Sequence, residues 1–184
     1  MTAYRYFTAS SLDGYIATAD DSLDWLLSQP IDAAGPMNYE EFIGDIGAIV
    51  MGATTCAWIL EHEESGPRPW PYAQPSFVLT HRDLTPPADG VAVVSGDVAA
   101  LRTRLEEAAA GKDVWIVGGG DLAAQFARAG MLDEVLISYA PVMLGAGRPL
   151  FPDRLDLELV ELARNEAFAC ARYAVADRPG ASGS

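Results

Sequence analysis

Residues 114–126 have the sequence VWIVGGGDLAAQF, which contains the sharpest change of pattern in the chain. Four apolar residues in a row are typical of a short strand buried on both faces, which implies a parallel sheet covered by helices. Three glycines follow, and the next apolar residues fall on one helical face until Gly130. Glycines let a ligand approach the backbone, and the N–H groups at a helix start attract phosphate. The segment therefore predicts either a nucleotide site or a turn that simply needs glycine.

The same segment also matches a dinucleotide-binding pattern that we reject. Gly118, Gly120 and Ala123 fit the G-x-G-x-x-A arrangement of Rossmann folds. That fingerprint belongs to the first strand of its domain, whereas several strand- and helix-sized segments precede it in this chain. A Rossmann domain is therefore not expected.

Length and composition bound the class of protein. The chain has 184 residues, half of them hydrophobic, which is enough for one domain with its own core. We expect a single domain over residues 1–176 and a disordered tail over residues 177–184. A net charge of −14 argues against a nucleic-acid partner. The sequence shows no apolar run of membrane-spanning length and no signal peptide, so it predicts a cytoplasmic protein that does not enter membranes.

The cysteines and histidines do not suggest a metal centre. Cys56 and Cys170 lack metal-ligand spacing, and His62 and His81 are far apart in the sequence. We therefore expect free thiols and no metal.

Two further predicted strands end in residues suited to a ligand. A strand over residues 48–52 leads into Gly52, Ala53, Thr54 and Thr55, and a strand over residues 76–79 leads into Thr80, His81 and Arg82. Ligands of parallel sheets bind outside the carboxyl ends of the strands. Together with Gly118, Gly119 and Gly120, these ends predict a dinucleotide site.

The remaining segments complete an α/β pattern. Strands alternate with helices, and residues 157–163 and 168–175 predict an antiparallel hairpin at the sheet edge. Asn38 is expected to cap a helix, with Glu41 three residues later. Residues 18–36 form an irregular acidic segment whose apolar anchor includes Trp25.

Six short motifs occur in a fixed order: SLDGYIA (11–17), VMG (50–52), LTHR (79–82), VGGG (117–120), LDE (132–134) and PVMLGAG (141–147). This set resembles the dihydrofolate-reductase-like superfamily. Within it, the chain is similar to stand-alone relatives of the reductase domain (C-terminal domain) of the bifunctional riboflavin biosynthesis deaminase-reductase. The resemblance covers roughly residues 4–175. It implies a three-layer α/β fold with a central mixed, mostly parallel sheet, helices on both faces and a C-terminal antiparallel hairpin.

The resemblance also implies an activity and a site. It implies an NADPH-dependent oxidoreductase, with NADH possible as cofactor, that is usually a homodimer. The implied cofactor-binding residues are Ala9, Ile16, Gly52, Ala53, Thr54, Thr55, Thr80, His81, Arg82, Val117, Gly118, Gly119, Gly120, Asp121 and Leu122. The implied substrate-facing residues are Asp13, Tyr15, Trp25, Tyr39 and Phe42.

Two departures from the family pattern reduce the range of substrates and cofactors that fit the sequence. Ala53 stands where dihydrofolate reductases carry an arginine for the 2′-phosphate, so Arg82, with His81, is left to favour NADP. The sequence between Arg5 and Arg68 contains no Lys or Arg, although riboflavin-pathway reductases place basic residues there for a phosphate. A phosphate among unpaired carboxylates would be repelled by about 1 kcal/mol or more per charge at contact distance. A pteridine- or aminopyrimidine-like heterocycle without phosphate fits better.

Several alternatives stay open at this point. Asp13 is either the catalytic polar group near the substrate or the residue that holds the turn at Gly14. Trp25 either closes over the substrate or anchors its loop. The protein is a reductase of unassigned heterocycles, or the 5-amino-6-(5-phosphoribosylamino)uracil reductase with a phosphate site at Arg148 or Arg154, or a non-catalytic nucleotide-binding protein.

Overall fold

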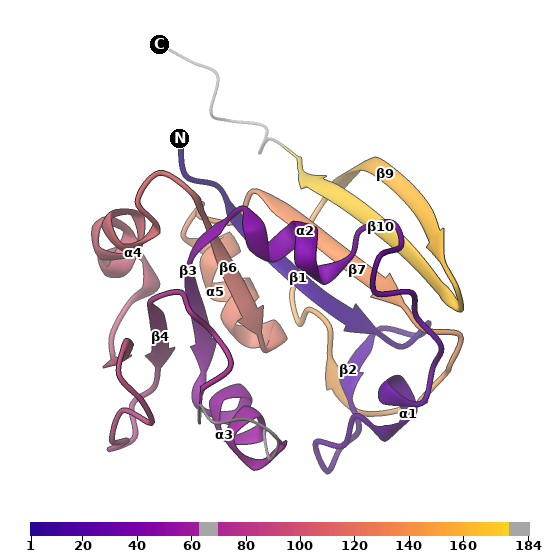
Figure 1. Cartoon of the computed structure of the whole chain (residues 1–184), viewed down its shortest axis with the longest axis horizontal. Coiled ribbons are helices and arrows are strands. Elements are labelled where there is room, and N and C mark those ends of the chain that lie inside the picture. Colours follow the sequence, from indigo (N-terminus) through magenta and orange to yellow (C-terminus); the bar gives the residue numbers. More distant parts are fainter. Residues whose placement is uncertain (63–69, 177–184) are drawn as a thin grey trace.

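The computed structural model describes residues 1–62 and 70–176, and these residues are organised around one large sheet. The sheet has eight strands in the order β5-β4-β3-β6-β1-β7-β10-β9. The pairs from β5 to β7 are all parallel, whereas β10 is antiparallel to both β7 and β9 (Figure 1). Strands β2 and β8 form a separate antiparallel pair.

The strands have the following bounds: β1 Tyr4–Ser10, β2 Tyr15–Ala17, β3 Ile46–Gly52, β4 Ser76–Leu79, β5 Val91–Val94, β6 Asp113–Gly118, β7 Glu134–Tyr139, β8 Arg148–Pro149, β9 Leu157–Asn165 and β10 Phe168–Val175. The helices have the following bounds: α1 Asp24–Leu27, α2 Tyr39–Gly44, α3 Ala53–His62, the 3₁₀ helix η1 Val98–Leu101, α4 Arg102–Ala109 and α5 Gly120–Arg128.

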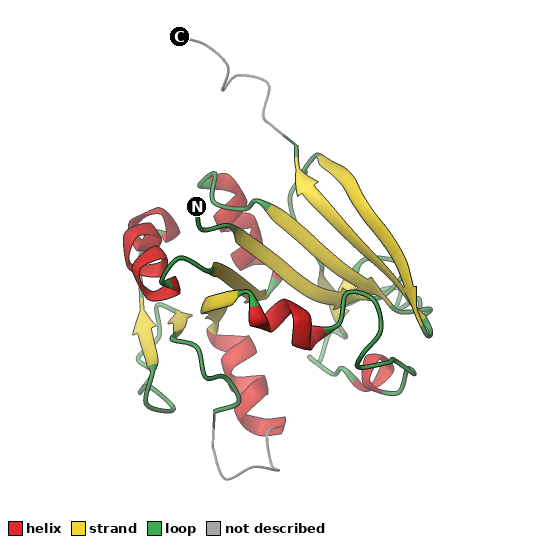
Figure 2. Ribbon diagram, turned by 45° about the horizontal axis from the view of Figure 1, so that its top comes forward, coloured by secondary structure: helices red, strands yellow, loops and turns green. Residues whose placement is uncertain are grey.

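Helices cover both faces of the sheet (Figure 2). Helices α2 and α3 pack with one apolar core, and η1, α4 and α5 pack with a second core on the opposite face. Strand β6 supplies both cores, because Val114 and Ile116 point to one face and Trp115 and Val117 to the other. Burial on both faces explains why β6 is a continuous apolar run rather than an alternating one.

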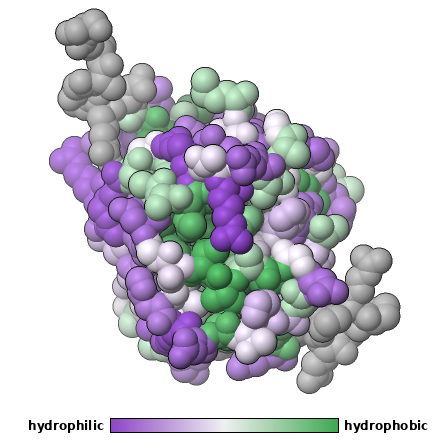
Figure 3. Space-filling view, turned by 90° about the vertical axis from the view of Figure 1, so that its left-hand side faces the viewer, coloured by the Kyte–Doolittle hydropathy of each residue, from purple (hydrophilic) through white to green (hydrophobic). Residues whose placement is uncertain are grey.

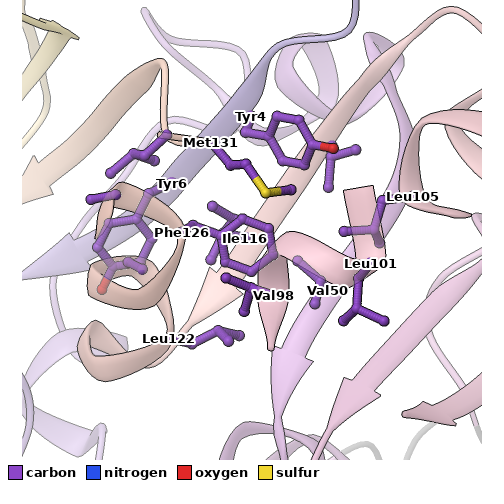
Figure 4. Close-up of a cluster of buried hydrophobic side chains, with 14 of the residues drawn as sticks. Tyr4, Tyr6, Val50, Val98, Leu101, Leu105, Ile116, Leu122, Phe126 and Met131 are labelled. Carbon is purple, nitrogen blue, oxygen red and sulfur yellow. The ribbon is translucent and has the colours of Figure 1, made fainter. Parts of the chain in front are cut away.

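The core on the α5 side is the larger of these two. Phe126 of α5 lies against Tyr4 of β1, with ring centroids 5.7 Å apart, and Leu105 of α4 is fully buried in the same cluster (Figure 4). Tyr6 is also fully buried, and its hydroxyl donates to the backbone oxygen of Leu150. Burial raises the pKa of the Tyr6 phenol, so Tyr6 stays neutral in the core.

Strand β5 forms one outer edge of the sheet. Strand β5 has only four residues, and Val91 and Val94 are buried. Seen from this side, hydrophobic residues form a band in the middle of the surface, with hydrophilic residues on either side (Figure 3). Within the described residues, no helix combines the length and the apolar character needed to cross a membrane.

The predicted fold class is confirmed: a three-layer α/β arrangement with a mixed, mostly parallel sheet and a C-terminal hairpin. Asn38 caps α2 as predicted, since its side chain accepts from the Glu41 N–H at 2.9 Å. The sequence did not predict α1 or the β2–β8 pair, which are too short to carry a periodic pattern. The expected tail, residues 177–184, lies outside the described residues.

Candidate functional site

Three predicted strand ends meet at one edge of the sheet. In the strand register, Gly52 of β3 lies beside Leu79 of β4, and Met51 lies beside Gly118 of β6. A Cβ placed on Gly52 would be 3.9 Å from the Gly118 oxygen. The strands β4, β3 and β6 are neighbours and parallel, so their carboxyl ends form one continuous edge. The three strand ends therefore lie together as expected, and their shared role as a cofactor site stays a prediction.

The start of α5 provides backbone donors at this edge. Gly119 occupies the N-cap position, and no side chain caps the helix. Gly118 has φ +148°, a conformation that side-chain-bearing residues rarely adopt. A Cβ on Gly120 would lie 2.5 Å from the Pro149 oxygen, so a side chain has no room there. The glycines therefore place a helix start that no side chain caps beside β8, with Gly119 half-buried, and such a start suits an anion.

A second helix start lies next to it. Helix α3 begins at Ala53, directly after β3, and the Thr55 hydroxyl would be 3.7 Å from a Cβ on Gly118. Thr54 is exposed at the same helix start. The two positive helix ends, the Thr55 hydroxyl and the glycine backbone form a donor set that fits a pyrophosphate.

The end of β4 supplies a cation. Thr80 is half-buried, and its hydroxyl accepts from the Arg82 N–H at 3.0 Å, which fixes the turn after the strand. His81 and Arg82 are exposed. Among the described residues, no carboxylate lies within ion-pair distance of Arg82, so its guanidinium is available to an external anion.

The β2–β8 pair closes the other end of this edge. The Ile16 side chain would lie 3.7 Å from a Cβ on Gly119, and its contact with the cofactor stays a prediction. Arg148 of β8 pairs with Asp21, with Nε–Oδ1 at 2.7 Å and Nη2–Oδ2 at 3.1 Å. Arg154 pairs with Asp156 instead and is almost fully exposed. Neither arginine is a free cation for a phosphate.

Asp13 is bonded to a loop of its own protein. Its carboxylate accepts from the backbone N–H groups of Leu144 at 3.0 Å and Gly145 at 2.7 Å, and from the Ser11 hydroxyl at 2.6 Å. The Ser11 hydroxyl and then the Leu144 N–H lower the pKa of Asp13 to about 2. This geometry supports the structural interpretation of Asp13, and its catalytic role stays a prediction.

Helix α2 and two central strands form an aromatic wall on the α2 side of the sheet. Phe42 is buried and stacks on Phe7 of β1 at a centroid distance of 4.2 Å, and it meets Trp115 of β6 edge-on at 5.4 Å. Tyr39 is 41% exposed and lies edge-on to Trp115 at 5.9 Å. Of the two predicted substrate contacts on α2, Tyr39 is accessible, whereas Phe42 belongs to the wall behind it.

The sheet positions between this wall and the glycines are only partly covered. Ala9 follows Phe7 on the same face of β1, and Val117 follows Trp115 on the same face of β6. Both are half-buried. They are the next apolar positions on this face of the two strands, toward the carboxyl ends of β1 and β6.

The other predicted site residues lie as follows. Trp25 packs with Phe168 and Cys170 of β10, and its ring N–H donates to the Ser22 oxygen, so it anchors its own segment. Tyr15 lies on β2 opposite Pro149. Leu122 is buried in the core behind α5, and the Asp121 carboxylate lies in the first turn of α5, where it complements the helix dipole. Within the described residues, no group of three or more His, Cys, Asp or Glu is placed to hold a metal ion.

Sequence patterns missed Trp115 and Phe7 as parts of the site. Both lie inside apolar strand runs, where nothing distinguishes a wall of a site from ordinary core. The Asp21–Arg148 pair joins residues 127 positions apart, and no local pattern marks it.

Comparisons with known proteins bear on this site. The model of the RibD C-terminal domain matches residues 4–173. The chain is 29% identical over 166 residues to the uncharacterized protein YwjB of Bacillus subtilis (strain 168), covering 90% of this chain and 91% of YwjB. It is also similar to a putative riboflavin biosynthesis protein from Shewanella sp. PV-4, with a TM-score of 0.82, 27% identity, and coverage of 95% and 99% of the two chains. The fold is shared with dihydrofolate reductase from Enterococcus faecalis, a structure in complex with NADP(H), with a TM-score of 0.62, 18% identity, and coverage of 95% and 97%.

Proposed function

The chain belongs to the RibD C-terminal domain family, and from this premise we propose that it is an NAD(P)H-dependent reductase of small heterocyclic compounds. The observation that carries the proposal is the edge formed by Gly52, Thr80 and Gly118, where two helix starts meet. A site of this kind fits the pyrophosphate of a dinucleotide. The Enterococcus faecalis reductase with NADP(H), which shares the fold, supports the same cofactor class.

The cofactor, when bound, supplies the hydride. The chain's own residues bind the cofactor and the substrate and orient them relative to each other. The backbone N–H groups of Gly119 and Gly120 and the Thr55 hydroxyl would hold the pyrophosphate. Arg82 would hold a 2′-phosphate, and Ile16 would pack against the nicotinamide end. Orientation of the two reactants and exclusion of water are what such a site contributes to the rate.

The proposed substrate is a planar heterocycle of the pteridine or aminopyrimidine class without a phosphate. Tyr39 offers an aromatic surface, and Ala9 and Val117 offer an apolar floor. The sequence supplies no Lys or Arg between Arg5 and Arg68, and Arg148 is neutralised by Asp21. An anionic substituent would therefore meet carboxylates rather than a free cation.

A second candidate is the 5-amino-6-(5-phosphoribosylamino)uracil reductase of riboflavin biosynthesis. The family match and the Shewanella relative favour this substrate, whereas the paired state of Arg148 and Arg154 does not. A third candidate is a nucleotide-binding protein without turnover.

Two measurements separate these candidates. The first is the change in NADPH fluorescence on titration with the protein, and the second is NADPH oxidation against a panel of pteridines, aminopyrimidines and their phosphoribosyl forms. The proposal expects binding, followed by oxidation with the compounds that lack phosphate. Faster turnover of the phosphoribosyl form would favour the riboflavin-pathway reductase, and tight binding without oxidation across the panel would favour the third candidate.

We also propose that the protein is a homodimer acting in the cytoplasm, with β9 at the interface. The edge strand β9 exposes four large apolar side chains: Leu157, Leu159, Val160 and Leu162. Edge strands of this kind pair with other chains unless they are covered. Full burial of a leucine side chain contributes about 1.5–3 kcal/mol of favourable free energy. A symmetric dimer in which β9 of each protomer is buried against the other can therefore be stable.

The oligomeric state tests this interface. Leu159→Glu and Leu162→Glu are expected to convert a dimer into a monomer in sedimentation experiments, because each places a charge in an apolar contact. Leu84→Glu changes an exposed leucine outside β9 and should leave the dimer intact. A monomeric wild-type protein would refute the dimer.

A further inference from the structure

Asn165, at the tip of the β9–β10 hairpin, is a buried polar residue that no part of the proposed reaction uses. It is 2% exposed, and its whole side-chain amide is engaged by the segment 28–38, which we call the strap. Its Oδ1 accepts from the Asp32 N–H at 2.9 Å, and its Nδ2 donates to the oxygens of Asp32 at 3.0 Å and Pro36 at 3.3 Å. A buried amide with three such bonds fixes its partner closely, since breaking them would leave buried polar groups unpaired.

Two further contacts hold the strap at the same place. The Ala167 N–H donates to the Pro30 oxygen at 3.3 Å. Gly35 packs so closely that a Cβ there would lie 2.6 Å from Asn165 Nδ2. The hairpin tip therefore contacts the backbone of the strap at four residues. It forms hydrogen bonds with Pro30, Asp32 and Pro36, and it packs closely against Gly35.

The strap continues directly into α2. Asn38, its last residue, donates to the Gly35 oxygen at 2.9 Å and caps α2 through Glu41. Helix α2 has only six residues, which is too short to be stable without external support. The position of α2 over the sheet is thus fixed by Phe42 packing on one side and by the strap on the other.

We propose that Asn165 is a positioning residue for the substrate: through the strap it sets α2, and with it the Tyr39 ring, at its place against Trp115, on the sheet face that carries Ala9 and Val117. This inference rests on the proposed function, because it assigns that surface to the substrate. The cofactor edge is built by β3, β4, β6 and the starts of α3 and α5, none of which the strap bonds. Loss of Asn165 should therefore affect the substrate and spare the cofactor.

Two variants disturb this contact from opposite sides. Asn165→Asp keeps the shape but replaces the Nδ2 donors with an oxygen that faces two carbonyls. Gly35→Ala leaves Asn165 unchanged and pushes the strap away, and it serves if Asn165→Asp does not fold. Glu166→Gln is the matched control, because Glu166 is the next residue of the hairpin tip and its side chain is exposed.

Hydrogen exchange and kinetics are measured on all three variants. Both strap variants are expected to exchange about tenfold faster or more over residues 28–44, with residues 113–128 unchanged. They should also raise KM for the best heterocycle about tenfold or more, with kcat and NADPH affinity within about twofold of wild type. Glu166→Gln should match wild type in every measurement.

The outcomes that overturn the proposal are distinct from those that overturn the function. Exchange over residues 28–44 equal to that of Glu166→Gln would show that Asn165 does not position α2. Faster exchange with unchanged KM would make the strap purely structural. A wild-type protein that oxidises NADPH with no compound of the panel refutes the reductase instead, whatever the exchange shows.

Discussion

Gly119 and Gly120 are adjacent, yet changing each to alanine is predicted to damage a different property: cofactor binding for Gly119 and fold stability for Gly120. A Cβ on Gly120 would lie 2.5 Å from the Pro149 oxygen and 2.6 Å from the Leu150 oxygen, both of them backbone atoms. A Cβ on Gly119 would meet only the end of the Ile16 side chain, at 3.7 Å, which is an ordinary contact. Gly120→Ala should therefore damage the fold, and Gly119→Ala should damage the cofactor site.

The size of the Gly120 effect follows from this geometry. Carbon–oxygen contacts begin at about 3.3 Å, so the start of α5 and the β8 segment must separate by roughly 0.8 Å. Overpacking of this kind costs about 1–3 kcal/mol, and the better helix propensity of alanine offsets at most about 1 kcal/mol. A net loss of about 1–2 kcal/mol lowers the Tm of a chain of this size by roughly 2–8 °C.

Thermal unfolding and NADPH titration of both variants check this pair. Gly119→Ala should lower the Tm by less than Gly120→Ala does, since alanine is only a poorer N-cap residue than glycine. It should weaken NADPH binding about tenfold or more, because its methyl group occupies the backbone surface that the pyrophosphate approaches. Gly120→Ala should show the fall in Tm. Equal Tm losses in the two variants, or a Gly120→Ala protein as stable as wild type, would refute the reasoning.

Three further predictions concern charged residues. Arg82→Ala should weaken the binding of NADPH about tenfold or more but that of NADH by less than about twofold, since only NADPH carries the 2′-phosphate. Equal losses of affinity in titrations with the two cofactors would contradict a contact between Arg82 and the 2′-phosphate. Arg5→Met should lower the free energy of unfolding by about 2–3 kcal/mol in urea, because it leaves Asp113 (2.9 Å) without its half-buried cation and leaves Glu134 (3.3 Å from Arg5) with Arg172 alone; an unchanged midpoint would contradict this. The folded pKa of Asp13, about 2, lies below its ordinary 3.8, so its tether to the 144–145 backbone is intact above about pH 4 and is lost as the pH falls toward 2. The amide signals of Leu144 and Gly145 should shift in that window in wild type and not in Asp13→Asn.

The acidic composition of the chain is consistent with the proposed substrate. The net charge is −14, and the carboxylates include Asp20 and Asp24 in the segment that leads from β2 to α2, and Glu40 in α2 itself. Arg148, which is brought to this region by the β2–β8 pair, is already neutralised by Asp21. Among relatives of a phosphoribosyl-binding enzyme, this arrangement favours uncharged or cationic heterocycles.

The sequence by itself determined the parallel strands, their main helices, the terminal hairpin and the strand ends that lie together at one edge of the sheet. These features depend on short-range patterns: β6 is a continuous apolar run because both its faces are buried, and its glycines follow it directly in the chain. Since parallel strands present their carboxyl ends on the same side, three local motifs were enough to predict one shared site.

Only the tertiary structure decided the substrate side. Asp13 is bonded to a loop 131 residues away, Asn165 holds a strap 129–133 residues away, and Trp25 packs against the hairpin rather than over the site. Each of these contacts joins segments with no sequence relation, and a polar or aromatic residue looks the same in a sequence whether its partner is a substrate or the protein itself. The proposed cofactor edge consists of backbone that local patterns specify, whereas the proposed substrate side consists of side chains whose partners are set by packing across the whole domain.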